Sequence, residues 1–223
     1  MSLKDILTGR RQVKGPAKDR LFAITTAYIT LQTEHDTQST GAAAIVFQAL
    51  SSSEFESTVK EMEEVVKATG AESGTQVSTV DDAYGYRWMV LRNPQGSSSV
   101  EDLAVGINAV SSSIEAAGYG ERLLCAVFSF RDSSGQPIYF IYNYKRGCWY
   151  PFVPKGHSRS SGSHSSTTGA TASFSSSQDN QQLPVDAGER STERELQLKA
   201  QLGSELPLEP ELERWFPLWG IPI

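Results

Sequence analysis

Residues 98–144 read SSVEDLAVGINAVSSSIEAAGYGERLLCAVFSFRDSSGQPIYFIYNY, and this stretch decides the fold. The pair Ser98 and Glu101 has the spacing of a capping box, and Gly118 is expected to end the helix that follows. Two strand-like runs, 123–130 and 138–144, are joined by a hairpin turn at 132–135. The helix presents one apolar face at spacing i, i+4, i+7, i+11, made by Leu103, Ile107, Val110 and Ile114.

The same pattern occurs once earlier in the chain. Ser53 and Glu56 form a second capping box, and Phe55, Val59, Met62 and Val66 repeat the helical spacing. Residues 83–92 alternate as a strand does, with 76–79 expected to pair with them, and one face carries Tyr84, Tyr86, Trp88 and Val90. Upstream, a helix over 19–31, a loop at 38–41 and a buried strand over 42–50 are expected.

One strand followed by two α-β-β units predicts an α+β fold, with a mostly antiparallel sheet packed against two or more helices. The domain organisation follows from composition. We expect a basic N-terminal arm over 1–19 and a core domain over 20–154. Residues 158–177 contain ten serines, so 155–187 are predicted to form a disordered linker. Residues 188–223 should contain an amphipathic helix at 191–202 and an aromatic-proline tail that packs on the core.

Charge and cysteine content limit the function classes. The net charge of −6 argues against nucleic-acid binding. Cys125 and Cys148 lie far apart, without the spacing of zinc ligands, and no apolar run is long enough to cross a membrane. We therefore expect a soluble, cytoplasmic protein. The arm carries five basic residues, with Arg20 directly after it, beside the apolar Leu3, Ile6 and Leu7. It is expected to make at most weak, transient contact with the inner, anionic face of the cell membrane.

A search for catalytic chemistry identifies no catalytic, metal-binding or cofactor-binding residue. Gly118 and Gly120 follow a helix, whereas a phosphate-binding loop precedes one. Glu63 and Glu64 are expected to be solvated, and Asp81 and Asp82 to stabilise a turn through local hydrogen bonds. The chain is therefore predicted not to be an enzyme and to need no cofactor.

Two aromatic-proline segments, 144–154 and 212–222, provide the candidate interaction residues. Lys145 and Arg146 lie among aromatic residues that could stack on bases, but a strand end with basic groups reaching into water is the preferred interpretation. The tail is expected to dock on the core near 149–152 because its rings are costly to expose, although a partner-binding peptide remains open. The alternative function is an enzyme or small-molecule-binding domain with a pocket near 144–152. The candidates are Tyr144, Lys145, Arg146, Trp149, Tyr150, Phe152, Arg214, Trp215, Phe216 and Trp219.

Several segments together resemble the PspAB family, PspA-associated proteins of prokaryotes with variant phage-shock (envelope-stress) systems. They are LFA at 21–23, DAYGYRW at 82–88, INAV at 107–110, AGYG at 117–120, LLC at 123–125, FRD at 130–132, YKRG at 144–147, YPF at 150–152 and RWFPLWG at 214–220. The opening, with Leu3, Leu7, Gly9 and Arg10, is also similar. The resemblance implies an accessory protein that binds a PspA-type membrane-repair protein or another stress-response component. It transfers no catalytic residue, and it departs at 155–187, where family members have a shorter connection.

Overall fold

The computed structural model describes residues 19–70, 74–155 and 188–223. A six-stranded sheet in the order β2-β3-β1-β4-β5-β6 forms its centre, and every pairing between these strands is antiparallel. The strands are β1 (Gln38–Gln48), β2 (Gln76–Asp81), β3 (Tyr86–Arg92), β4 (Leu123–Arg131), β5 (Pro137–Asn143) and β6 (Cys148–Phe152). The predicted basic arm over 1–19, except Asp19, and the predicted linker over 155–187, except Lys155, lie outside the described residues.

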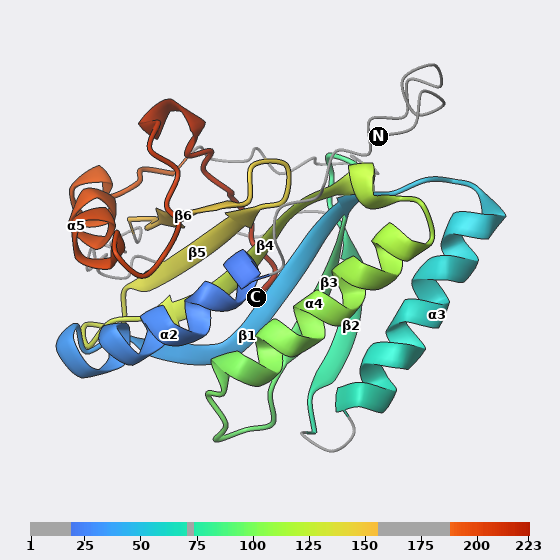
Figure 1. The fold of residues 1–223 in the computed structure, drawn as a ribbon, viewed down its shortest axis with the longest axis horizontal. Helices are drawn as coiled ribbons and strands as arrows, with labels where there is room; N and C mark the ends of the chain where they lie inside the picture. Colours follow the sequence, from blue (N-terminus) through green and yellow to red (C-terminus); the bar gives the residue numbers. More distant parts are fainter. Residues whose placement is uncertain (1–18, 71–73, 156–187) are drawn as a thin grey trace, which may run out of the picture.

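Three helices cover one face of the sheet. They are α2 (Asp19–Glu34), α3 (Ser53–Gly70) and α4 (Val100–Ala116), which lie side by side in Figure 1. A fourth helix, α5 (Thr192–Leu202), packs beside β6, the edge strand at the opposite end of the sheet from β2. The predicted α+β class, with a mostly antiparallel sheet against helices, is confirmed. None of the helices in the described part of the chain is long and apolar enough to cross a membrane.

Both faces of the sheet are buried, each in its own hydrophobic cluster. Along β3, Met89 and Leu91 point to the helices, whereas Trp88 and Val90 point to the opposite face, as the alternation predicts. The C-terminal residues Leu218, Trp219, Ile221 and Ile223 pack on that opposite face. Arg92 at the end of β3 also donates to the carbonyl of Pro222 at 3.0 Å. The tail therefore reaches from β6 to β3 and serves as the second layer of the core.

Several sequence predictions were wrong in detail. The loop expected at 38–41 is instead the first part of β1. The pairing of β1 with β4 shifts register between Ser39 and Ala43, so the strand continues through an irregularity at this point. Gly41 lies there with φ of 71°, and a Cβ at this position would approach the carbonyl oxygen of Ser97 to 2.7 Å. The cap of α4 is Ser99 rather than Ser98, since its side chain accepts from the Asp102 N–H at 3.1 Å.

The strand β6 was not predicted, because it contains a proline. Trp149 donates its N–H to Pro207 and accepts at its carbonyl from Glu209, at 2.9 and 2.8 Å. The carbonyl of Val153 accepts from the N–H of Ser191 at 2.7 Å, also on the side of β6 that faces away from β5. Because backbone groups alternate in direction along a strand, the nitrogen of Pro151 also points away from β5. The proline therefore removes no hydrogen bond from the β5–β6 ladder. Residues 189–191 and 207–209 close this edge of the sheet.

Candidate functional site

The two aromatic-proline segments meet in space. Trp215 stacks on Tyr150 with ring centroids 6.4 Å apart, and Trp219 packs edge-on against Phe152 at 5.0 Å. The hydroxyl of Tyr150 donates to the carbonyl of Phe216 at 3.1 Å. The predicted docking of the tail near 149–152 is confirmed by these contacts. We call the contact between 144–154 and 207–223 the junction.

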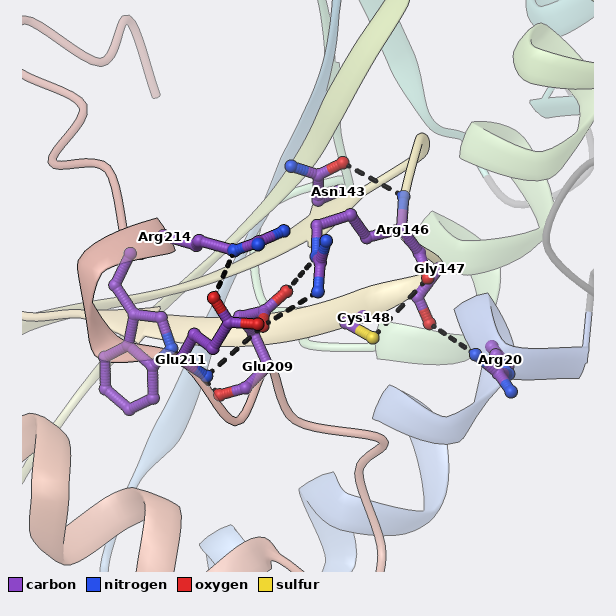
Figure 2. A network of polar contacts seen from close by, with 9 residues as sticks. Arg20, Asn143, Arg146, Gly147, Cys148, Glu209, Glu211 and Arg214 are labelled. Atoms are coloured by element: carbon purple, nitrogen blue, oxygen red, sulfur yellow. Dashed lines mark hydrogen bonds and ion pairs between the residues drawn. The ribbon is translucent and has the colours of Figure 1, made fainter.

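An ion pair between Arg146 and Glu209 lies at the centre of the junction (Figure 2). The Glu209 side chain is only 3% exposed, and its Oε1 also accepts from the Glu211 N–H at 3.2 Å. Burial alone would raise the pKa of Glu209, but the hydrogen bonds from Arg146 and Glu211 and the positive charges of Arg146 and Arg214 outweigh it, so this pKa is lowered. Arg214 itself pairs with Glu211 at 2.6 Å. Glu209 is therefore a fixed carboxylate that holds the tail to the turn before β6.

A second buried carboxylate, Glu195 on α5, connects three segments. It is fully buried, and it accepts from the backbone N–H of Val153 at 2.9 Å and from Arg190 Nε at 2.8 Å. The same guanidinium donates to the carbonyl of Trp215 at 2.7 Å. Because a buried charge is tolerated only when it is paired, this arrangement holds α5, β6 and the tail together. Glu195 and Glu209 are not among the residues predicted from the sequence, since nothing near them in the chain indicates burial.

The turn before β6 is also tied to the first described helix. Trp149 is fully buried, and its indole N–H donates to the carbonyl of Arg20 at 2.7 Å. Arg20 donates in return to the carbonyl of Gly147 at 3.3 Å. The Trp149 ring packs between Phe128 and Tyr142. The start of α2 therefore lies directly beside the junction, as Figure 2 shows.

The candidate residues divide into buried, half-buried and exposed groups; Arg214 and Trp219 are half-buried, and Arg146 is exposed. Trp149, Tyr150, Phe152 and Trp215 are buried and packed in the two clusters. Lys145 is exposed, and Phe216 is exposed over 60% of its surface. Phe216 is nevertheless fixed, because its carbonyl accepts from Tyr150 and the preceding carbonyl accepts from Arg190. The junction thus presents Lys145 and Phe216 on a rigid base.

Tyr144 is buried, and its hydroxyl makes no hydrogen bond with standard geometry. Burial raises its pKa, and the nearby hydroxyl of Ser111 on α4 partly opposes this effect. The phenol is therefore neutral at physiological pH. Its ring packs edge-on against Tyr142 at 5.2 Å, so the side chain is part of the helix-side core.

The described residues offer little for metal or thiol chemistry. No group of three or more His, Cys, Asp or Glu side chains within them is arranged to hold a metal ion. Burial raises the pKa of Cys125 to about 12, so this thiol is neutral and a poor nucleophile. Cys148 is partly exposed, and its thiol donates to the carbonyl of Arg146 at 3.5 Å. Glu63, expected to be solvated, instead accepts from the hydroxyl of Thr79.

A further exposed surface lies at the β2–β3 hairpin. Asp82 Oδ1 accepts from the N–H groups of Tyr84 and Tyr86 at 2.8 and 2.9 Å, and Oδ2 accepts from the Trp88 indole at 2.9 Å. These hydrogen bonds fix a turn that leaves Tyr84 66% and Tyr86 38% exposed. The sequence placed both tyrosines on a strand face; Tyr84 belongs to the turn. The Asp-Ala-Tyr-Gly order, with Gly85 at φ of 81°, was the available signal.

A model of the family described as PspAB, PspA associated protein B, matches residues 1–166 and 181–223. This chain belongs to the PspAB family. The match includes the core, the junction and the β2–β3 hairpin, and it leaves only 167–180 uncovered, inside the Ser-rich stretch. No curated protein and no solved structure matches the chain. Membership of the PspAB family, as its name states, associates the chain with PspA and is consistent with an accessory role.

Proposed function

We propose that this PspAB-family chain is a non-enzymatic accessory protein that binds a PspA-type protein in an envelope-stress response. The observation that carries the proposal is the family match on both sides of the Ser-rich stretch, since the family is named for its association with PspA. The proposed place of action is the cytoplasm, at or near the inner face of the membrane. Any weak membrane contact would involve the basic arm, which lies outside the described residues.

The junction supports a binding role better than a reaction site. Its large aromatic rings are packed against each other, so they are not free to line a substrate pocket. Its carboxylates Glu195 and Glu209 are each paired with an arginine, and the pKa of Glu209 is lowered by its hydrogen bonds and by nearby positive charge, which keeps Glu209 ionised and acceptor-only. A general acid or base needs a pKa near the working pH. Lys145 and Phe216, which project from this rigid base, are the residues proposed to contact the partner.

Isothermal titration of the purified full chain with the PspA-type protein of the same genome tests the proposal. We expect a saturable complex, and Phe216→Ser should weaken it about tenfold, equivalent to about 1.4 kcal/mol. Val105→Ser is the matched control, because Val105 is an exposed apolar residue on α4, away from the junction, and it should bind as the wild type does. No heat and no co-elution at any ratio would refute the binding role. If Phe216→Ser binds with the affinity of the wild type, the junction is not part of the interface.

A further inference from the structure

The two edges of the sheet differ in how they are closed. The outer edge of β6 pairs with residues 189–191 and 207–209 of the same chain. At the other end of the sheet, β2 pairs with β3, and no second strand in the described ranges 19–70, 74–155 and 188–223 pairs with it. An open edge presents unpaired backbone donors and acceptors, so it is a template for a further strand.

The register identifies which backbone groups are available. The N–H of Asp82 donates to the carbonyl of Tyr86 at 2.9 Å, and the β2–β3 register continues from this pair without a shift. Hydrogen-bonded and non-bonded pairs alternate along an antiparallel ladder. Residues 76, 78 and 80 therefore bond to β3, and the backbone groups of Val77, Thr79 and Asp81 point outward.

Natural edge strands are commonly protected by lysine, proline or a bulge. The strand β2 reads QVSTVD, with neither lysine nor proline, and its pairing with β3 has no bulge. Its single charge, Asp81, lies at the end of the strand. Of the features that discourage pairing with another strand, β2 therefore has only this terminal charge.

Side chains beside the edge favour an apolar neighbour on one face. Val80 pairs in register with Trp88 and is 43% exposed, and Tyr86 points to the same face at 38% exposure. Tyr84 in the adjoining turn is 66% exposed, and the hydrogen bonds to Asp82 hold this turn in place. Main-chain pairing together with side-chain contacts of this kind is the mode by which sheet edges bind extended peptides.

The position of α3 determines what kind of strand fits. This helix packs on β2, the Thr79 hydroxyl donates to Glu63, and Figure 1 shows α3 lying along the edge of the sheet. Antiparallel pairing of β2 with a second copy would place the two strands about 4.8 Å apart. The two copies of α3, each lying over its own β2, would then be separated by about the same distance, whereas packed helix axes need about 8–10 Å. A single strand without a covering helix avoids this clash.

The charges at the edge indicate the composition of that strand. Asp81 points to the helix side and stays 57% exposed, even though Arg87 pairs with it at 2.6 Å. The Arg87 side chain is only 14% exposed and also pairs with Glu56, so its single positive charge is shared between two carboxylates. A cation opposite Asp81 would therefore meet an accessible carboxylate.

We propose that the outer edge of β2 binds an extended segment of the partner protein as a seventh strand. This segment is apolar on the side of Val80 and Tyr86, and it carries a lysine or arginine opposite Asp81. The inference rests on the proposed function, because it names a second surface, apart from the junction, through which the same partner is held. The junction and the β2 edge lie at opposite ends of the strand order, so the variants at each test different contacts.

The test compares Thr79→Pro with Thr79→Ala in the full chain, using titration with the PspA-type protein and hydrogen exchange. Proline removes the outward N–H without breaking the ladder to β3, whereas alanine keeps that N–H and removes only the contact with Glu63. Thr79→Pro should weaken binding at least tenfold, and Thr79→Ala less than twofold. On binding, the amides of Val77, Thr79 and Asp81 should exchange more slowly. Tyr86→Ser, which leaves the β2 backbone unchanged, should also weaken binding and serves if Thr79→Pro fails to fold.

The outcomes separate this inference from the proposed function. If the PspA-type protein binds but Thr79→Pro and Tyr86→Ser bind equally well and the three amides stay unprotected, the edge strand is refuted and the accessory role stands. If that protein does not bind, a synthetic octapeptide alternating valine and lysine is the second probe. Protection of the same amides by the peptide would support the edge site, and its absence would overturn it. Protection that appears with protein concentration alone, with a dimer in sedimentation, would assign the edge to a second copy and overturn the partner strand.

Discussion

Replacing Trp215 by alanine is the most direct test of the tail as part of the core. The side chain is 3% exposed and stacks on Tyr150. Its indole N–H donates to the carbonyl of Glu209 at 3.0 Å, and the ammonium of Lys199 lies 5.4 Å from the ring centroid. Removing a buried tryptophan typically costs about 3–5 kcal/mol, because apolar contact is lost and a cavity remains. We expect a loss of this size in the free energy of unfolding.

Urea unfolding followed by circular dichroism measures this loss, and a thermal scan gives a second value. For a chain of this length, each kcal/mol corresponds to about 2–4 °C in Tm. The melting temperature should therefore fall by about 6–20 °C. Unchanged secondary structure at low temperature would show that the variant still folds.

Phe216→Ala is the matched control, since this neighbouring aromatic residue is 60% exposed. Its substitution should change stability by no more than about 0.5 kcal/mol. If Trp215→Ala costs less than about 1 kcal/mol, or if both variants cost the same, the tail contributes little to the core. The tail would then not act as the second layer of the core.

Three further predictions concern buried polar groups. Glu195→Ala should lower the free energy of unfolding by about 3–5 kcal/mol, because it leaves Arg190 and the Val153 N–H without their acceptor; the exposed neighbour Glu193→Ala should be nearly neutral in the same urea titration. The pKa of Glu209 is lowered in the folded state, so its ionisation contributes stability that is fully present above the unfolded pKa near 4.5 and is lost as pH falls through the folded pKa. The difference in the free energy of unfolding between wild type and Glu209→Gln should therefore shrink on acidification from pH 6 to pH 3. A difference that stays constant over this range would contradict the prediction. Ellman's reagent should label Cys148 in the native protein and Cys125 only after unfolding, and rapid labelling of both native thiols would show that Cys125 is accessible.

Much of the core domain could be predicted from the sequence, because its signals are local. The spacing of Leu103, Ile107, Val110 and Ile114 requires only that a helix has one apolar face, and all four are buried on α4. The alternation through Trp88, Met89 and Val90 likewise depends only on the period of a strand. The hairpin turn at 132–135 follows from aspartate and glycine chemistry, whereas the turn expected at Asp81 and Asp82 extends to Gly85, into residues that were expected to begin a strand.

The candidate site was predicted in composition and only partly in geometry. The aromatic residues of both segments identified the tail and β6 as neighbours, since rings of this size are costly to expose. The sequence could not indicate which rings would be buried. Trp215 and Phe216 are adjacent and similar in hydrophobicity, yet one is buried and the other is exposed. That difference depends on the backbone direction at these two residues, which is fixed by the hydrogen bonds from Tyr150 to the Phe216 carbonyl and from Arg190 to the Trp215 carbonyl.

The sequence by itself determined the α+β class and most of the helices and strands with their order, because each of these is encoded within a few residues. Only the tertiary structure decided which edge of the sheet is closed and which charges are buried. The pairing of Glu195 with Arg190 and Val153, and of Arg146 with Glu209 across 63 positions, depends on segments that meet only after folding. So does the contrast between β6, whose outer edge is covered by residues 189–191 and 207–209, and β2, whose outer edge pairs with no other strand in the described part of the chain. Such features depend on the three-dimensional environment, which no local pattern along the chain specifies.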